Sequence, residues 1–244
     1  MTATFAFILL RGKIGKVDKY TYCLAGTLPF ATLGLYNGIR HWGAGPTMIL
    51  LTTTPLINFA FGVYSGKKPS GAAVGSLFLL LSGVSMALWG GSWNWIGFSW
   101  TIFATLLSGI LYECFARAKS KPLEKCFYSA SAMGTLGLVV SLAMDASWTQ
   151  TCEPNTMMTL VLFAFIGGFL YWMANLLAFE NLPVAEASVL AQLETPAVIL
   201  GESLFLGKYL LGYQWIGVTI ALCGGSLLAL WLAKQVEKEK GERQ

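Results

Sequence analysis

The sequence predicts an all-α membrane protein, a polytopic helix bundle of two inverted repeats with about eight full transmembrane helices. Three observations predict this fold: the composition, the length of the apolar stretches and an internal repeat. The 244 residues are 55% hydrophobic and 11% charged, and their mean hydropathy is +0.62. A soluble domain of this size does not need so much apolar surface.

Eight apolar stretches follow one another along the chain. Each is long enough to cross a hydrocarbon core of about 30 Å, which takes roughly 20 helical residues. We expect helices because the runs are too long and too uniformly apolar for the in–out alternation of a membrane barrel. The predicted helices lie near 20–40, 44–64, 71–91, 96–116, 127–146, 156–179, 184–206 and 213–233.

An internal repeat relates two parts of this series. Residues 22–88 align with residues 163–229 at a constant offset of 141. The matches include glycines and a proline, which serve backbone geometry and therefore indicate a shared architecture. Matched pairs are Gly26 with Gly167, Thr54 with Thr195, Pro55 with Pro196, Gly66 with Gly207, Gly71 with Gly212 and Gly83 with Gly224.

The repeat and the loops together divide the chain into four parts. We expect a partial helix and loop at 1–19, an incomplete first repeat at 20–91, a second repeat at 96–233 and a charged cytoplasmic tail at 234–244.

The basic residues predict the orientation of the helices, because Lys and Arg near membrane ends stay on the cytoplasmic side. Of the 16 basic residues, 14 lie in alternate loops or in the terminal segments, and only Arg40 and Lys208 fall on the other side. We therefore expect a multi-pass protein of the plasma (inner) membrane with both termini cytoplasmic. The net charge of +4 then reflects topology and indicates no nucleic-acid partner. Tryptophans 89, 93, 95 and 100 are expected in an outer interfacial belt.

Orientation also relates the two repeats. Five predicted crossings, an odd number, separate the loop at Lys67 from the loop at Lys208, so the repeats should lie in opposite orientations. Inverted repeats are typical of secondary transporters, in which two halves of equal fold expose one central site to either side alternately.

The last three predicted helices carry a recognisable series of motifs: a glutamate and a proline within 184–206, a Gly-Lys turn, then Gly217 and Gly224. This segment, Leu176 to Leu228, resembles the final helices of EamA-type members of the drug/metabolite transporter superfamily. The segment Leu35 to Ala87 resembles the corresponding part of the first half. The resemblance implies a secondary transporter of small metabolites such as amino acids, or of organic drugs, usually by efflux.

The chain departs from that family at its start. The family has ten helices, five per repeat, whereas Met1 to Leu10 spans only about 15 Å if helical. The first helix and most of the second are therefore expected to be missing. Either the natural chain begins upstream of Met1, or this is a shortened form. A non-transporting or partner-dependent membrane scaffold is then the alternative function.

Two polar stripes are candidates for a binding cavity. Helical spacing places Thr47, Leu51, Thr54 and Asn58 on one face of 44–64, and the repeat partners on 184–206 are Ser188, Gln192, Thr195 and Ile199. Pro55 and Pro196 kink these helices and free the carbonyls of Leu51 and Gln192. We expect the stripes to line a midplane cavity. The alternative is that the polar groups only bind helices together and the prolines only bend them.

Glu194 is expected near the middle of its helix, where an acidic side chain costs about 2.5–3.5 kcal/mol on insertion scales. One interpretation is a site for a substrate ammonium group or a proton, and the other is a neutral residue in helix packing. Tyr36 and Asn175 are further cavity candidates, with core packing as the alternative. Glu202 is expected near the outer surface.

The remaining polar groups predict little chemistry. Glu113 precedes Arg117 by four residues, which predicts an ion pair within one helix. The single histidine, His41, and five scattered cysteines form no metal-binding or catalytic pattern, and no phosphate-binding loop is present. We therefore expect no metal, no cofactor and no enzymatic activity. The expected partners are the lipid bilayer and a small organic solute, while a proton or counter-substrate and a homodimer stay open.

Overall fold

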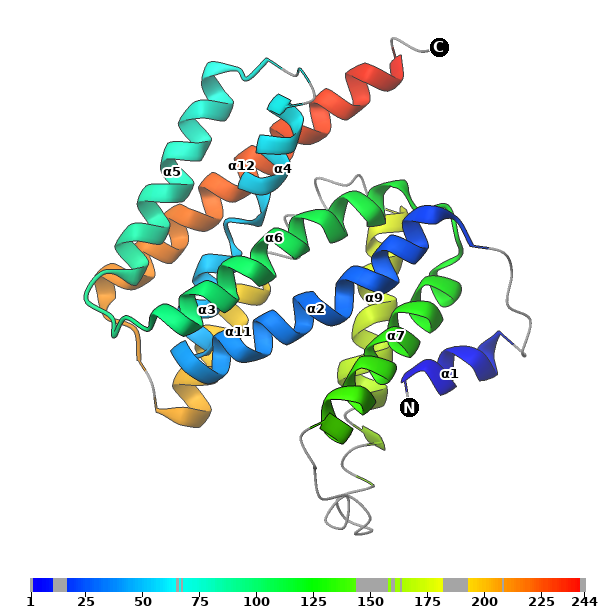
Figure 1. Ribbon diagram of the computed structural model, residues 1–244. Coiled ribbons are helices and arrows are strands. Elements are labelled where there is room, and N and C mark those ends of the chain that lie inside the picture. The colour runs from blue at the N-terminus through cyan, green and yellow to red at the C-terminus, as the bar shows by residue number, and fades with distance from the viewer. Residues whose placement is uncertain are drawn as a thin grey trace. The chain divides into compact units, whose positions relative to one another are not determined.

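The computed structural model describes residues 2–10, 17–64, 66, 68–143, 158, 161–162, 164–181, 193–207 and 209–241. All regular secondary structure in this part of the chain is helical (Figure 1), which confirms the predicted all-α fold. The helices are α1 (Thr2–Leu9), α2 (Lys19–Trp42), α3 (Ala44–Leu51), α4 (Thr54–Tyr64), α5 (Gly71–Leu88), α6 (Trp95–Arg117), α7 (Pro122–Ala143), η2 (Ala164–Leu170), α9 (Tyr171–Asn181), α11 (Glu194–Leu206) and α12 (Gly212–Gly241).

The helices follow the apolar stretches, with three local differences. The expected helix at 44–64 is broken between α3 and α4, and the expected helix at 156–179 contains a π-helical turn, η2. The last helix, α12, continues beyond residue 233 to Gly241. Its extension is rich in lysine and glutamate, which are good helix formers, so the charged tail is helical as far as Gly241.

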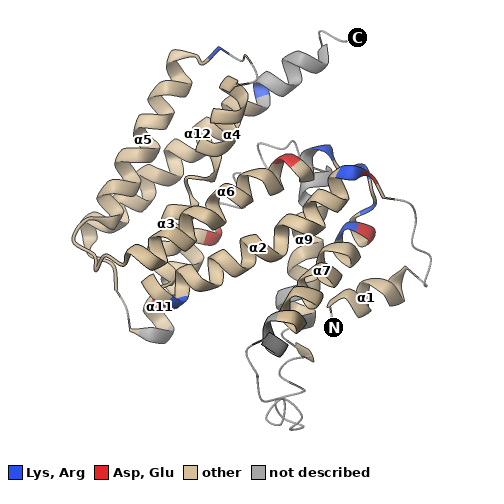
Figure 2. Cartoon of the chain, viewed as in Figure 1, with Lys and Arg blue, Asp and Glu red and all other residues tan. Residues whose placement is uncertain are grey.

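Four helical segments of the described chain are long and apolar enough to cross a membrane. Charged residues gather near helix ends and leave most helix middles without charge (Figure 2). This distribution suits a polytopic membrane bundle, because a charge in the hydrocarbon core is costly. The four segments are Ala44–Tyr64, Gly71–Leu88, Trp95–Phe115 and Gly212–Leu232.

The chain forms two compact units. The first contains Met1–Pro29 and Leu111–Asn181, and the second contains Phe30–Ile110 and Leu182–Gln244. Each unit takes residues from both predicted repeats, and α2 and α6 contribute to both units.

In the second unit, α5 and α12 pack side by side along much of their length (Figure 1). Gly83 of α5 lies so close to α12 that an added Cβ would overlap the backbone of Ala221, and a Cβ on Gly217 would lie 2.5 Å from the nitrogen of Ala87. Positions rise along α5 as they fall along α12, so the helices are antiparallel. Small residues permit this backbone approach, as is common between membrane helices.

The contacts of this pair obey the offset of 141 residues found in the sequence. When each residue is exchanged for its repeat partner, Gly83 and Ala221 become Gly224 and Leu80. Gly224 does lie against the backbone of Leu80. The matched residues Gly66 and Gly207 also agree, since both have positive φ angles, of 88° and 64°, a conformation that glycine adopts readily.

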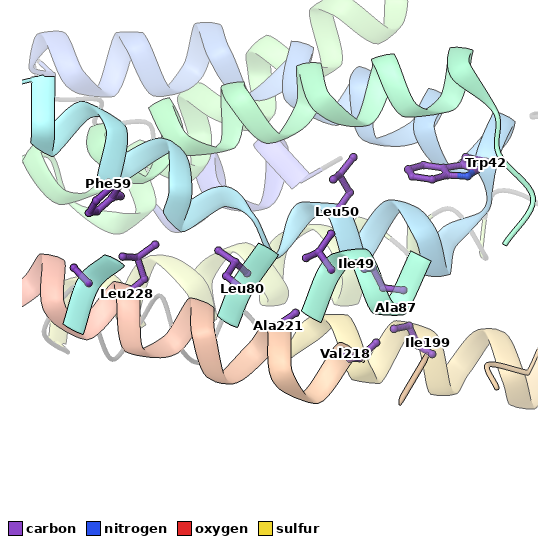
Figure 3. Packing of buried hydrophobic residues seen from close by; sticks show 12 residues of the cluster. Trp42, Ile49, Leu50, Phe59, Leu80, Ala87, Ile199, Val218, Ala221 and Leu228 are labelled. Atoms are coloured by element: carbon purple, nitrogen blue, oxygen red, sulfur yellow. The ribbon is translucent and has the colours of Figure 1, made fainter. Parts of the chain in front are cut away.

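Apolar side chains complete the core on either side of the glycine contacts (Figure 3). Leu80 and Leu228 are fully buried where α5 meets α12, and Ile49 and Ile199 join the same cluster from α3 and α11.

In the first unit, the Asp18 carboxylate fastens the start of α2 to the loop between α6 and α7. Its Oδ1 accepts hydrogen bonds from the backbone N–H groups of Tyr20 and Thr21, at 2.9 and 3.1 Å. Its Oδ2 accepts from the backbone of Lys119 at 2.9 Å and of Ser120 at 3.1 Å, and from the hydroxyls of Ser120 and Thr21 at 2.9 and 3.2 Å. Burial raises the pKa of Asp18, but these donors outweigh burial and hold it well below its ordinary 3.8.

Replacing Gly83 by alanine should destabilise the α5–α12 pair by about 2–3 kcal/mol, because the obstructing atoms are backbone and cannot turn away. The matched control is Gly75→Ala on the same helix, where an added Cβ meets nothing within 4 Å. That change should stabilise the protein by up to about 1 kcal/mol through helix propensity. Denaturant unfolding in detergent measures both variants, and equal effects would contradict the close backbone contact.

Asp18→Asn should lower the melting temperature at neutral pH, because the amide cannot replace a carboxylate that accepts six hydrogen bonds. A lowered folded-state pKa means that the stabilisation is present above the unfolded pKa, 3.8, and is lost as pH falls towards the folded pKa. The difference between wild type and variant should therefore be constant from about pH 7 to 5 and shrink near pH 3.

The control for Asp18→Asn is Glu124→Gln, because Glu124 lies next to the same loop and its carboxylate accepts from the backbone of Lys121, at 3.1 Å. Its effect on the melting temperature should be much smaller. A pH-independent difference for Asp18→Asn would contradict the carboxylate's role.

Candidate functional site

The candidate site surrounds the break between α3 and α4, where the sequence reads Leu-Thr-Thr-Thr-Pro from Leu51 to Pro55. Pro55 lacks a backbone donor and its ring crowds the preceding turn, so a regular helix cannot continue through it. The hydroxyls of Thr52, Thr53 and Thr54 each donate to the carbonyl three residues earlier, at 2.6, 2.7 and 2.7 Å. The break is therefore stabilised by the side chains that form it.

One of these hydrogen bonds satisfies the Leu51 carbonyl, which Pro55 was expected to leave without a donor. The Leu51 carbonyl accepts the Thr54 hydroxyl at 2.7 Å. That carbonyl and the Thr54 hydroxyl thus partner each other within the chain. At this position the Thr54 hydroxyl is satisfied within its own segment, 44–64.

The equivalent Thr-Pro pair of the second repeat contacts α3. Thr195, in the first turn of α11, is only 3% exposed, and its hydroxyl donates to the carbonyl of Met48 at 3.4 Å. The same carbonyl accepts the backbone N–H of Thr52 at 3.2 Å, just before the break. The structure therefore places Thr195 of α11 against α3, one turn before the break.

Glu202 of α11 also contacts α3, at its N-terminal end. Its carboxylate accepts the backbone N–H groups of Ala44 at 3.3 Å and Gly45 at 2.6 Å. The N-cap residue of α3 is Gly43, which has no side chain to cap the helix, so Glu202 supplies the missing acceptor and a favourable negative charge.

This role of Glu202 was not predicted from the sequence, which indicated only that the residue lies near the outer surface. A signal was available, because residues 43–46 read Gly-Ala-Gly-Pro and offer none of the usual capping side chains.

Two oxygens of the predicted polar stripe are buried without a hydrogen-bond partner among the residues described, Oγ1 of Thr47 and Oδ1 of Asn58. Thr47 is 0% exposed. It lies where α2, α3 and α6 meet, because a Cβ on Gly38 would lie 2.5 Å from the Thr101 hydroxyl and 3.2 Å from Thr47 Cγ2. Asn58 faces α6 near Gly109. Such unpaired polar atoms are costly unless another group binds to them.

The other predicted site residues are more scattered. Glu194 is the first residue of α11, and its side chain is exposed. Tyr36 on α2 is 62% exposed, and the side-chain amide of Asn175, in the first unit, donates to the carbonyl of Tyr171 at 3.0 Å. Ser188 and Gln192 lie outside the described residues.

Charge is sparse around the break. Residues 44–64 and 193–207 contain no lysine or arginine, and their acids are Glu194 and Glu202. The predicted ion pair of Glu113 with Arg117 is confirmed at 2.9 Å, at the end of α6. A surface hollow of about 470 Å³ lies elsewhere, lined by Met86, Trp89 and Tyr213.

Because residues 44–64 and 193–207 contain acids but no lysine or arginine, the site is suited to hydrogen bonding and to positively charged or neutral groups.

The sequence of the chain matches the EamA-like transporter family over residues 95–230, which is more than half of its length. None of the curated proteins matches it. The matched region runs from the start of α6 into α12 and includes α11 with Thr195 and Glu202. Its helices include two of the four segments long and apolar enough to cross a membrane. The protein is an integral membrane protein and belongs to the EamA-like transporter family.

Proposed function

We propose that this protein exports a small organic solute, such as an amino acid or an organic drug, across the plasma membrane by alternating access. The observation that carries the proposal is that side-chain oxygens of Thr47 on α3 and Asn58 on α4 are buried without a hydrogen-bond partner among the described residues. In a transporter, a solute that donates hydrogen bonds can satisfy such atoms.

The glycine contacts support a mechanism based on inverted repeats. Repeat partners α5 and α12 are antiparallel, and their contacts exchange under the offset of 141 residues. Two related halves of opposite orientation can exchange conformations around one site, which is the basis of alternating access. The distribution of basic residues supports cytoplasmic termini for this arrangement.

The chemistry of the site favours cationic, zwitterionic or neutral solutes. Thr47 and Asn58 offer acceptors, and α3 and α4, the helices that carry them, contain no basic residue that would pair with a phosphate or carboxylate. Glu194, at the start of α11, is the proposed carrier of a coupling proton or the partner of a substrate ammonium group, because it and Glu202 are the acids of residues 44–64 and 193–207 and Glu202 caps α3.

The contacts between α3 and α11 also suit a moving element. Side-chain hydrogen bonds from Thr195 and Glu202 hold the two helices together at two points. Such bonds can be exchanged for bonds to a solute or to water, whereas the backbone contacts of α5 and α12 leave no room for insertion. We therefore assign the movement to α3 and α11 and the fixed support to α5 and α12.

Thr47→Val should lower solute flux about tenfold in proteoliposomes while leaving the melting temperature equal or higher, because valine keeps the shape and removes an unpaired hydroxyl. The flux assay uses amino acids and organic cations as solutes. The matched control is Thr105→Val, at a threonine 2% exposed whose hydroxyl donates to the Thr101 carbonyl at 2.8 Å.

The control variant should keep wild-type flux. If Thr47→Val transports every solute at the wild-type rate, Thr47 does not bind the solute. If wild-type protein transports none of the solutes tested, the transport proposal gives way to a scaffold role, which co-purification of a stoichiometric partner would support.

Glu194→Gln should remove the response of flux to an imposed pH gradient, since the amide cannot carry a proton. Flux without a gradient should persist if Glu194 acts only in coupling. Glu124, in the first turn of α7, supplies the control variant, Glu124→Gln, which should respond to the gradient as wild type does. A full gradient response from Glu194→Gln would contradict the coupling role.

A further inference from the structure

Two cysteines of the first unit face each other between α2 and α6. Cys23 lies in the second turn of α2 and is exposed, and Cys114 lies near the end of α6 and is 4% exposed. Both are free thiols, and their side chains lie close enough to interact with each other.

The register of the two helices places these thiols opposite each other. Asp18 binds the backbone of Lys119, and the guanidinium carbon of Arg117 lies 6.0 Å from the centre of the Tyr20 ring. Residue numbers therefore rise along α2 as they fall along the facing part of α6, so the two helices are antiparallel in a constant register. The next contact in this antiparallel series is Cys23 with Cys114.

The surroundings hold this register in place. The Asp18 carboxylate fixes the start of α2 to the residues just after α6. Two cationic side chains lie near the Tyr20 ring: Arg117 and Lys19, whose ammonium nitrogen is 5.2 Å from the ring centre. The two thiols thus lie on neighbouring helices held in one register, and a disulfide can form only between cysteines that the backbone holds close together.

We propose that Cys23 and Cys114 form a reversible disulfide that links α2 to α6 under oxidising conditions. Hydrogen peroxide is the oxidant: the exposed Cys23 thiol attacks it to give a sulfenic acid and one water. The Cys114 sulfur then attacks the Cys23 sulfur, the S–S bond forms, and the hydroxyl leaves with the Cys114 proton as a second water. A dithiol reductant reverses the link by thiol–disulfide exchange.

The expected consequence is a loss of transport, and this part of the inference rests on the proposed function. Both α2 and α6 contribute to both compact units. A covalent bond would fix the two helices at one register, so any step of the transport cycle that shifts them along each other would stop. The formation of the disulfide itself does not depend on transport and can be measured separately.

The test treats purified full-length protein in liposomes with hydrogen peroxide, digests it without reduction and identifies linked peptides by mass spectrometry. A peptide pair joining Cys23 to Cys114, lighter by two hydrogens and separated by dithiothreitol, is the expected result. Cys23→Ser and Cys114→Ser should each abolish it. The matched control is Cys223→Ser, which removes an exposed cysteine of the second unit and should leave the link unchanged.

Solute flux is measured on the same samples. Oxidised wild type and Cys223→Ser should lose most of their flux and regain it with dithiothreitol, whereas Cys23→Ser should keep its flux. Absence of the linked peptides, or a link of Cys23 to another cysteine, would overturn the disulfide assignment whatever the flux. If the disulfide-linked protein transports as fast as the dithiol form, the disulfide is not a switch. If the linked peptides form but the dithiol form shows no flux, only the proposed transport function is contradicted.

Discussion

The direct backbone contact between α5 and α12 is the constraint on which the second unit depends. Lipid tails are as apolar as leucine, so moving apolar side chains from lipid into a helix contact contributes little free energy of association. Close van der Waals packing must supply the attraction instead. Gly83, Gly217 and Gly224 provide it, because each lies where a Cβ would meet backbone of the facing helix. α3 and α4 pack against this pair, and α11 packs on α3. Close packing therefore supports the helices that carry the site.

The site itself is held by a different kind of contact. The break at Thr52 and Thr53, the Thr195 hydroxyl and the Glu202 carboxylate all use side-chain hydrogen bonds. These bonds are individually modest and exchangeable, whereas helix backbones in direct contact cannot separate without losing packing along their length. The proposed transport mechanism uses both kinds of contact, with α5 and α12 as the fixed support and α3 and α11 as the helices that respond to a solute.

Helix positions could be predicted from the sequence because span length and apolar composition are local properties, and the glycine pairs could be predicted because the repeat aligns them. Contacts between distant residues could not. Glu202 caps a helix that begins 158 positions earlier, and Asp18 binds a loop about a hundred residues away. The polar stripe was predicted from helical spacing, but the hydrogen bonds of its members depended on geometry: Thr54 bonds within its own segment, whereas side-chain oxygens of Thr47 and Asn58 have no partner among the described residues. The exposure of Tyr36 likewise depends on how α2 packs.

The most direct test of alternating access at this site is the reactivity of a single cysteine at position 58 in an otherwise cysteine-free protein, reconstituted in oriented vesicles. Membrane-impermeant maleimide, added to one side at a time, measures whether Asn58→Cys is reached from each side. The proposed mechanism predicts labelling from both sides, with a transported solute slowing both rates, and no labelling of a control cysteine at Ala221, which is 1% exposed between α5 and α12. Labelling of position 58 from one side only, or from neither, would contradict a cavity that opens alternately at the helix break.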